Sequence, residues 1–522
     1  MEIAIALLLV QSALPGPELA LAQPALLGQP VELRVESPQP DALAWLLASP
    51  KAGSIALPFG VLELDPAGLV LLAAGSTGAS ASLALSFPTQ AAVAAAEAEV
   101  HAQAVVLDPA TASLSVTNAL HFRLRSSRAY VGVDGMAAPG RLQAWSMTTR
   151  TLIFSVLAPI GPASEDSTAG ADELPRVVTS RDGLLAAFVS NTPALVVFDD
   201  SFGTIEHEIP LVAPARQLAL DANGTGVHVL QPAAGLLSRI DLAGGTIQAT
   251  LALPGPCTSE WTVSADRRTA YVALVSAAGA PARIARIDLD ALALTDVTDV
   301  FPAPTPGAKL TVDDLGLSGE RLVVVGTSFE FLLGPQWHAF GATLDYAQQP
   351  PSVTSASEQG AGWTDLLVAP EFGAAIAVRN AFFLYGLTYV GFPIANPGAF
   401  APFAPWHPFT ASGPPVLCHD ADRLWVLNDD NHDSNYQLFE LDWSSWVWKQ
   451  HWINGWCLPG PHDLALVADA YSDLVVLIVE SHPLACPQYQ GQVAFLDAET
   501  GATLALHGAG GLPRWVEAVV VP

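Results

Sequence analysis

Basic residues are scarce in this chain of 522 residues, which has 21 lysine and arginine residues against 50 aspartate and glutamate residues. The formal net charge is therefore −29 at pH 7. So much negative charge repels the phosphates of nucleic acids and the headgroups of anionic membranes. We therefore expect neither nucleic acid nor an anionic membrane surface as a partner, and the simplest role of the acidity is solubility.

Cysteine is also rare, and the four cysteines are Cys257, Cys418, Cys457 and Cys486. No two of them form a C-x-x-C pair, so a zinc knuckle is not expected. Four cysteines in an exported chain permit two disulfides in three connectivities, and buried free thiols are the equal alternative. The sequence does not choose between these states.

Long apolar runs, amphipathic helical repeats and common catalytic motifs are missing as well. No run approaches the roughly 20 uninterrupted apolar residues that span a bilayer, so no transmembrane segment is expected. The sequence has no G-x-S-x-G elbow, P-loop or H-E-x-x-H motif. The chain is 51% hydrophobic, and 41 glycines and 42 prolines divide its apolar residues into short runs. This punctuation predicts an all-β protein.

A repeated pattern of four apolar runs gives the clearest structural signal. The pattern fills residues 175–212 and recurs in the same order over residues 215–254. Asp182-Gly183 and Asn223-Gly224 separate the first two runs and are hairpin signals, because these residues tolerate positive φ. Each copy therefore predicts a four-stranded antiparallel sheet. Stacking such sheets around an axis buries both faces of each one, which is the architecture of a β-propeller.

The second strand of the repeat recurs about eight times between residues 129 and 477, at the spacing of propeller blades. The sequence thus predicts a β-propeller over residues 122–522, with about eight four-stranded blades or alternatively seven. The first copy lacks its first strand, and Trp515–Val521 matches a first strand with nothing after it. We expect this C-terminal strand to pair with Arg128–Val133, which would complete one blade and close the ring.

Residues 23–121 do not show this repeat. Their short runs, several of which alternate between apolar and polar residues, predict a small antiparallel β-sandwich with an immunoglobulin-like shape. Including one run just before residue 23, strands are expected at residues 19–22, 30–35, 42–47, 60–64, 68–72, 80–86, 100–107 and 112–116. Residues 1–22 combine an apolar run with small residues at Ala20 and Ala22, which indicates an export signal that lacks a basic N-terminal region. A first strand of the mature domain is the alternative.

Residues 175–254 resemble the YVTN-type repeat of surface-layer-like β-propellers. Phe188-Val-Ser-Asn191 stands at the namesake motif, and after it come a strand that ends in an acidic residue and a strand that begins with Thr-Ile. Ala129–Asp134 and Ala270–Leu274 are weaker copies. The resemblance implies a secreted or cell-surface propeller of WD40-like architecture. It implies no reaction, because such propellers serve both binding and catalysis.

One loop in a late repeat carries the oxygen ligands that calcium prefers. The candidate ligands are Asp429, Asn431, Asp433, Asn435 and Glu440. The first four alternate and Glu440 follows eleven residues after the first, which is the ligand spacing of a calcium loop. Ser434 stands where such a loop turns on glycine, and strands rather than helices flank it. Calcium is the one cofactor that the sequence suggests, and a solvated polar loop is the alternative.

Tryptophans gather in the same repeat. Trp443, Trp446, Trp448 and Trp452 lie within one short stretch. Aromatic side chains at this density suit a platform for stacking sugars or for docking a partner protein. Packing within one blade or against the N-terminal domain is the alternative.

The favoured function is a non-catalytic binding or interaction module that is secreted, periplasmic or at the cell surface. Its partner would be an unidentified protein or glycan, and we expect a monomer. The alternative is a propeller hydrolase or lyase acting on a carbohydrate or lactone, with a metal near the central channel. His419-Asp420 and His462-Asp463 are the candidates for such chemistry, because each places an imidazole beside a carboxylate.

Overall fold

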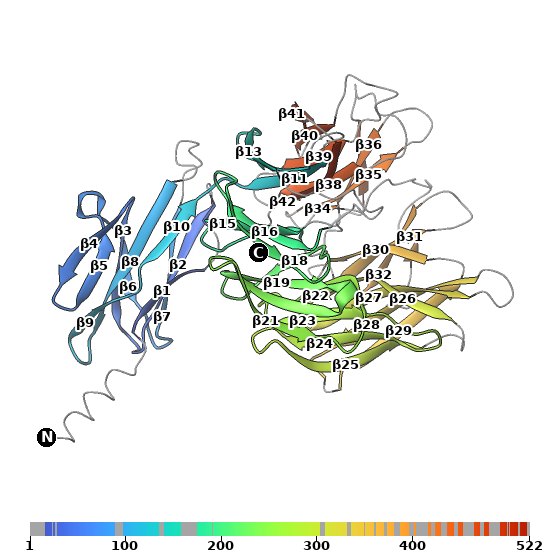
Figure 1. Ribbon diagram of the computed structural model, residues 1–522, viewed down its shortest axis with the longest axis horizontal. Coiled ribbons are helices and arrows are strands. Elements are labelled where there is room, and N and C mark those ends of the chain that lie inside the picture. The colour runs from blue at the N-terminus through green and yellow to red at the C-terminus, as the bar shows by residue number, and fades with distance from the viewer. Residues whose placement is uncertain are drawn as a thin grey trace. The chain divides into compact units, whose positions relative to one another are not determined.

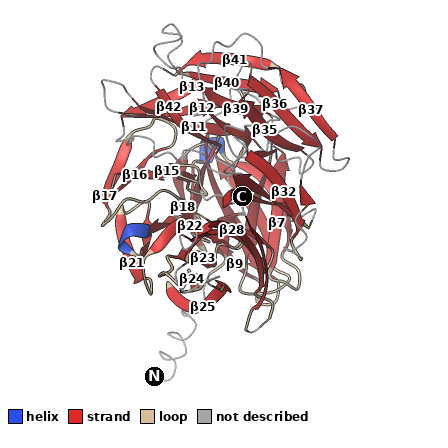
Figure 2. Cartoon of the chain, turned by 90° about the vertical axis from the view of Figure 1, so that its right-hand side faces the viewer, coloured by secondary structure: helices blue, strands red, loops and turns tan. Residues whose placement is uncertain are grey.

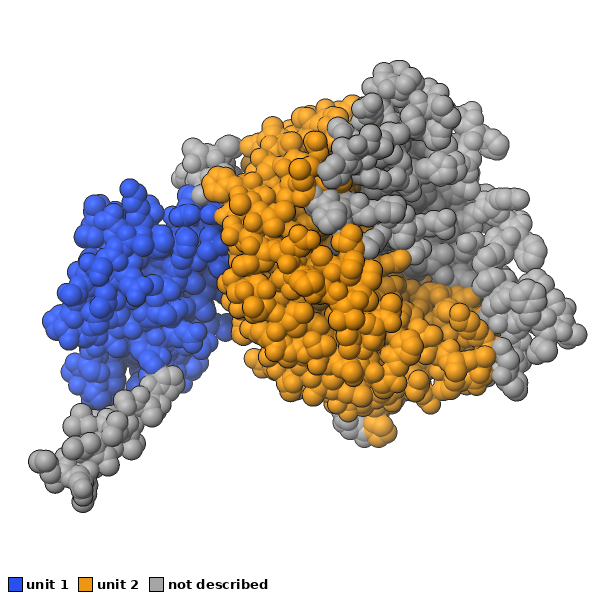
Figure 3. Space-filling model, in the orientation of Figure 1, with its two compact units in different colours: residues 1–127, 180–184, 521–522 blue, residues 128–179, 185–520 orange. Residues whose placement is uncertain are grey.

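The computed structural model describes residues 16–22, 25–26, 29–88, 98–134, 140–157, 175–189, 192–302, 308–330, 336–348, 350–359, 362–369, 373–380, 387–395, 401–402, 416–418, 423–429, 436–442, 447–452, 464–469, 474–479, 491–497, 500, 502–509 and 512–518. The chain divides into two compact units (Figure 3). Unit 1 comprises residues 1–127, 180–184 and 521–522, and unit 2 comprises residues 128–179 and 185–520. Strands make up almost all of the regular structure in both units (Figure 2).

Unit 1 contains two main antiparallel sheets and a hairpin. One sheet has the strand order β1-β2-β7, the other has the order β10-β8-β3-β6 with β9 paired to β8, and β4 pairs with β5. The strands are β1 (Glu18–Leu21), β2 (Pro30–Glu36), β3 (Leu43–Ser49), β4 (Ala52–Leu57), β5 (Gly60–Leu64), β6 (Val70–Ser76), β7 (Ser82–Pro88), β8 (Ala98–Asp108), β9 (Ser113–Val116) and β10 (Leu120–Leu124), and η1 (Pro66–Gly68) is a short 3-10 helix.

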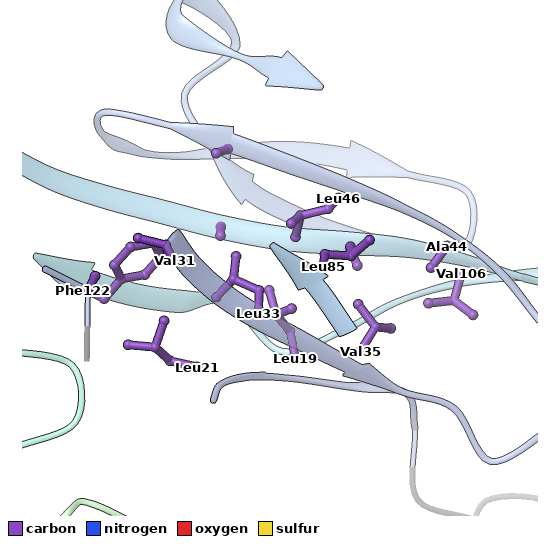
Figure 4. Close-up of a cluster of buried hydrophobic side chains, with 14 of the residues drawn as sticks. Leu19, Leu21, Val31, Leu33, Val35, Ala44, Leu46, Leu85, Val106 and Phe122 are labelled. Carbon is purple, nitrogen blue, oxygen red and sulfur yellow. The ribbon is translucent and has the colours of Figure 1, made fainter. Parts of the chain in front are cut away.

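The two sheets of unit 1 share one hydrophobic core, because their strands alternate between buried and exposed residues. In β2 the side chains of Val31, Leu33 and Val35 are buried while their neighbours are exposed. They pack with Leu46 of β3 and Phe122 of β10 (Figure 4). Burying a side chain of this size stabilises the fold by about 1.5–3 kcal/mol, so the alternation fixes which face of each sheet points inward.

Each of the eight segments expected to be strands in this region overlaps an observed strand, and β4 and β10 are additional. β1 begins at Glu18, upstream of the expected boundary at residue 22, and β10 ends at Leu124, beyond the expected boundary at residue 121. β1 pairs with β2 and buries Leu19 and Leu21. β1 is therefore a core strand that lies within residues 1–22, the segment of the possible export signal.

Unit 2 is built from four-stranded antiparallel sheets, which is β-propeller architecture, and the described part of the chain contains eight of them (Figure 1). The first four sheets are β42 (Leu512–Ala518) with β11 (Arg128–Asp134), β12 (Arg141–Ser146) and β13 (Leu152–Leu157); β14 (Val177–Thr179), β15 (Leu185–Val189), β16 (Ala194–Asp199) and β17 (Ile205–Pro210); β18 (Leu218–Leu220), β19 (Gly226–Gln231), β20 (Leu236–Asp241) and β21 (Thr246–Ala252); and β22 (Cys257–Val263), β23 (Thr269–Leu274), β24 (Ala282–Asp288) and β25 (Ala293–Phe301).

The later sheets follow the same order along the chain. They are β26 (Lys309–Ser318), β27 (Arg321–Glu330), β28 (Gln336–Asp345) and β29 (Ser352–Gln359); β30 (Gly362–Ala369), β31 (Ala374–Asn380), β32 (Leu387–Pro393) and β33 (Ala401–Pro402); β34 (Val416–Cys418), β35 (Arg423–Asp429), β36 (Tyr436–Asp442) and β37 (Val447–Trp452); and β38 (Leu464–Asp469), β39 (Leu474–Val479), β40 (Gln492–Asp497) and β41 (Thr503–Gly508). A short 3-10 helix, η3 (Pro232–Ala234), joins β19 to β20.

Aspartates hold the turns between strands. In the turn that follows a first strand, Asp182 and Asp221 each accept a hydrogen bond from a backbone N–H of their own turn. At the end of third strands, Asp199 accepts from the N–H groups of Ser201 and Phe202. Asp288, Asp345 and Asp497 accept in the same way in three other sheets. The recurring acidic residue of the repeat is therefore a turn cap, which satisfies backbone donors that the sheet leaves unpaired.

The C-terminal strand pairs with the first strand of unit 2, as expected from the unfinished repeat. β42 runs antiparallel to β11, with Val516 opposite Val131 and Ala518 opposite Ala129. The pairing is confirmed, and β42 occupies Leu512–Ala518, a few residues earlier than expected. The sheet β13-β12-β11-β42 therefore joins both ends of unit 2.

Packing across the sheets supports this closure on both sides of β11. On one side Val131 and Trp145 share a core with Phe495 of β40, so the last sheet packs on the first. On the other side Phe198, fully buried, contacts the rings of Tyr130 and Phe154 edge to face. Edge-to-face rings add about 0.5–1.5 kcal/mol to the burial energy.

A buried ion pair also joins the closing sheet to the next one. The guanidinium Nη1 of Arg128 lies 3.0 Å from Oδ1 of Asp200, and both side chains are almost fully buried at 1% and 0% exposure. The hydroxyl of Tyr130 donates to the same carboxylate. Loss of either charge would leave the opposite charge buried without its ion-pair partner, so this pair fixes how the two sheets meet.

First strands of neighbouring sheets contact one another. Such contacts join β14 to β18, β22 to β26, β26 to β30, β34 to β38 and β38 to β42. The first strands therefore form the inner part of unit 2, and β42 takes the first-strand position in its sheet.

Deletion of residues 513–522 is expected to destabilise unit 2 as a whole. The deletion removes the β42 ladder, whose backbone hydrogen bonds contribute about 1 kcal/mol each, and leaves β11 as an open edge. We expect a fall in the midpoint of thermal unfolding and a loss of solubility. The control is Leu504→Pro, at a bulge of the outer strand β41, where proline is tolerated. Equal midpoints for the truncated and full chains would contradict this role of β42.

Candidate functional site

The residues expected to bind calcium lie partly outside the described residues. Asp429 is the last residue of β35 and pairs with Tyr436, whereas Glu440 lies in β36 opposite Trp425. Trp425 precedes Asp429 by four residues, which corresponds to about 13 Å along a strand. Asn431, Asp433 and Asn435 are outside the described residues. Calcium binding by this loop stays a prediction. Glu440 lies along β36, well away from the loop end of the hairpin where Asp429 lies.

Two of the predicted tryptophans are in a strand. Trp448 and Trp452 belong to β37, the outermost strand of its sheet. Trp443 and Trp446 lie outside the described residues, as do both His-Asp pairs. A binding role for the tryptophans stays a prediction.

Cys257 is a buried free thiol, and burial raises its pKa to about 11. Its Sγ contacts the carbonyl oxygen of Pro232 at 3.6 Å. A free Cys257 leaves three cysteines, which permit at most one disulfide within the chain. Cys418 is in β34, and Cys457 and Cys486 lie outside the described residues.

Two histidines and a glutamate come together on one face of the larger sheet of unit 1. His101 and Glu99 are two residues apart in β8, so their side chains leave the same face of the strand. In β10 His121 lies directly opposite His101, and Arg123 lies directly opposite Glu99. Directly opposite residues have Cβ atoms about 4.5–5.5 Å apart, so the register alone brings the four side chains into contact.

The side chains form a compact histidine–carboxylate cluster. The rings of His101 and His121 stack with centroids 4.3 Å apart and planes 5° from parallel. Oε2 of Glu99 is 3.6 Å from Nε2 of His121, while Oε1 accepts a hydrogen bond of 3.1 Å from Nη2 of Arg123. One potential ligand atom from each of Glu99, His101 and His121 lies within 4.8 Å of the others. It is the one such group that the described residues contain.

The protonation states of the cluster follow from its surroundings. The hydrogen bond from Arg123 lowers the pKa of Glu99, which is therefore ionised at neutral pH. Burial lowers the pKa of His101, and the neighbouring His121 lowers it further. His101 is therefore a neutral imidazole at pH 7, a form that can donate a lone pair.

Sequence reasoning missed this cluster, although a signal for it exists. Glu99-Val-His101 and His121-Phe-Arg123 are short alternating patterns that match when the two strands run antiparallel. Finding the match requires β10 as a strand and its register with β8. The expected end of the domain at residue 121 falls within β10, so it keeps His121 with His101 but cuts off Arg123, the partner of Glu99.

A carboxyl group in unit 2 has a strongly perturbed acidity. Asp313 lies at a bulge in β26, the first strand of its sheet. Burial raises its pKa to about 7, although hydroxyls of Thr327 and Thr311 donate to the carboxylate and lower it, and Glu260 nearby raises it. A carboxyl group that titrates near neutrality is suited to general acid or base chemistry.

Replacing Asp313 with asparagine is expected to stabilise the protein at high pH only. The pKa is about 7 in the folded state against 3.8 as the ordinary value, so the folded state holds its proton more tightly. Stability is therefore lost as pH rises from about 4 to about 7 and stays lower above that. Because one pKa unit is worth about 1.4 kcal/mol, Asp313→Asn should gain up to ~4 kcal/mol at pH 8 and almost nothing at pH 4. Denaturant unfolding at both pH values measures this, and an equal effect at both would contradict it.

No family model and no curated protein matches the chain. Solved structures do resemble it. AztD from Citrobacter koseri has 10% identity and a TM-score of 0.46, over 76% of this chain and 99% of its own. The WD40 repeats of RRP9 have 12% identity and a TM-score of 0.39, over 61% and 92%. Hydrazine synthase of Kuenenia stuttgartiensis has 11% identity and a TM-score of 0.43, over 64% and 97%.

The propeller architecture of unit 2 therefore rests on its own eight four-stranded sheets in the described residues. In the part of the chain that the structure describes, no helix has the length and apolar character needed to cross a membrane.

Proposed function

We propose that the chain is an exported or cell-surface binding protein without catalytic activity, in which a β-sandwich precedes an eight-bladed propeller of the YVTN type. The two sheets of unit 1 around one core support the sandwich. The eight four-stranded sheets of the described residues, together with the β42–β11 pairing, support the blade number and the closed ring. An export signal would have to be cleaved before Glu18, because β1 is part of the core.

The proposal of a binding role rests on what the repeated aspartates do in the structure. Asp182, Asp199 and Asp221 each accept backbone hydrogen bonds within their own turns, and Asp288, Asp345 and Asp497 do the same in other sheets. These residues serve the turns rather than a substrate. The repeats thus build a rigid frame whose loops present a surface to a protein or a glycan, as propellers do without a reaction of their own.

A second candidate function is hydrolysis or elimination on a carbohydrate or lactone. The observation in its favour is Asp313, whose pKa of about 7 suits an acid–base group and which lies on an inner strand. Thr311 and Thr327 would hold its carboxyl group in one orientation.

One experiment separates the two functions. The full chain and Asp313→Asn are incubated with panels of glycans, lactones and peptides, and both thermal shift and product formation are measured. A binding protein gains stability from its ligand, about 2.7 kcal/mol at 100 times the dissociation constant, without product, and Asp313→Asn keeps the gain. If the full chain forms product and Asp313→Asn does not, the binding role is overturned and the chain is an enzyme.

We also propose calcium binding by the loop that begins at Asp429, with ligands from Asp429, Asn431, Asp433 and Asn435. Calcium at about 1 mM, acting on a site with a dissociation constant of about 10 μM, would add roughly 2.7 kcal/mol to the free energy of unfolding. Asp429→Ala combined with Asp433→Ala should abolish this gain, whereas Glu440→Gln should keep it because Glu440 lies opposite Trp425. A melting curve that is the same with calcium and with chelator would sink the proposal.

A further inference from the structure

We propose that Glu99, His101 and His121 form a binding site for a first-row transition metal ion, with Zn²⁺ as the reference ion. The site lies entirely in unit 1 and is independent of the function proposed for the propeller. It uses one nitrogen from each imidazole and one carboxylate oxygen, and it leaves a coordination position for water or a further ligand.

The ligand atoms are already gathered. The three potential ligand atoms lie within 4.8 Å of one another, and each side chain is placed by a strand rather than by a loop. Two nitrogens bound to one tetrahedral ion at about 2.0–2.1 Å are a little over 3 Å apart, so a small movement completes the site. Side chains held on strands are more precisely placed than side chains on loops.

The free cluster leaves one ring nitrogen unsatisfied. Nε2 of His121 is shielded from solvent and has no hydrogen-bond partner among the described residues. The nearest carboxylate atom, Oε2 of Glu99, is 3.6 Å away, which is too long for a hydrogen bond. A buried nitrogen without a partner is unfavourable, and a metal ion bound between it and Oε2 would satisfy both atoms.

Arg123 orients the carboxylate for this role. Its Nη2 holds Oε1 of Glu99 at 3.1 Å, and the Arg123 side chain is only 6% exposed. The second oxygen, Oε2, is thereby turned toward His121. Groups that fix the ligands of a metal site in this way commonly change its affinity by about 10–100-fold.

The stacked rings have to move before a metal binds. In the stack the planes are 5° from parallel, so the two lone pairs point side by side and do not converge. Rotation of one ring about its Cβ–Cγ bond corrects this, and that torsion has a broad energy profile in histidine. The stack is therefore the metal-free arrangement.

The chemistry of the ligands selects the class of metal. Imidazole suits zinc, copper, nickel and cobalt, whereas calcium and magnesium prefer sites made of oxygen ligands. A set of two histidines and one carboxylate with an open position is a ligand set that zinc accepts. The site therefore differs in its ion from the calcium loop proposed in the propeller.

The test uses the full chain, purified without a histidine tag and freed of metal with a chelator. Titration with Zn²⁺ against a chromophoric chelator should give one site that weakens about tenfold or more in His101→Ala and in His121→Ala, and that also weakens in Glu99→Gln. The control is His207→Ala, because Nε2 of His207 bonds the backbone oxygen of Ala243 outside the cluster. Unchanged affinity in both cluster variants, or no binding by the full chain, would overturn the proposal.

A second measurement needs no substitution, in case a variant fails to fold. Diethyl pyrocarbonate modifies free imidazoles, and mass spectrometry reports each histidine separately. Zn²⁺ should protect His101 and His121 in the full chain while His207 reacts as before. Equal modification of His101 and His121 with and without Zn²⁺ would contradict the site.

Discussion

The pairing of β42 with β11 is the constraint on which unit 2 depends. In an open row of sheets, the first and the last sheet each have one face that packs against no other sheet. A strand at an exposed edge also leaves backbone groups unpaired, which costs hydrogen bonds or invites aggregation. Here one sheet draws three strands from the start of unit 2 and one from its end. The first sheet then packs on the last through Val131 and Phe495. The end faces are thereby covered and the edge of β11 is paired, all within one chain.

The closing sheet also takes part in a deeply buried ion pair. Arg128 and Asp200 form an ion pair at almost zero exposure, and Tyr130 adds a hydrogen bond to the same carboxylate. Such a pair contributes little net stability compared with apolar packing, but it tolerates only one geometry. The aromatic contacts of Phe198 supply the apolar stabilisation around it. The ion pair, which fixes the geometry, and the aromatic contacts, which add stability, thus lie at the same junction between the closing sheet and the next one.

Much of the fold was predictable because its signals are local or repeated. The turn aspartates, such as Asp199, and the unfinished first strand near Trp515 are visible in the sequence, and they give the sheets and the closing pair. The histidine–carboxylate cluster was not predictable in the same way. His101 and His121 meet only through the register of β8 with β10, and the segment of β10 was not among the expected strands. Asp313 likewise owes its raised pKa to burial, which the sequence does not reveal.

Hydrogen exchange on the intact chain tests the central claim most directly. If β42 closes unit 2, the amides of β42 exchange at rates like those of other first strands such as β14 and β18, and the amides of β11 at rates like those of the second strands β15 and β19. Opening of either strand then requires the closed structure to open, so peptides covering residues 512–518 and 128–134 should be protected together. Rapid exchange of residues 512–518 beside a protected β14 and β18 would show that the C-terminal strand frays independently, and would contradict closure as the basis of the fold.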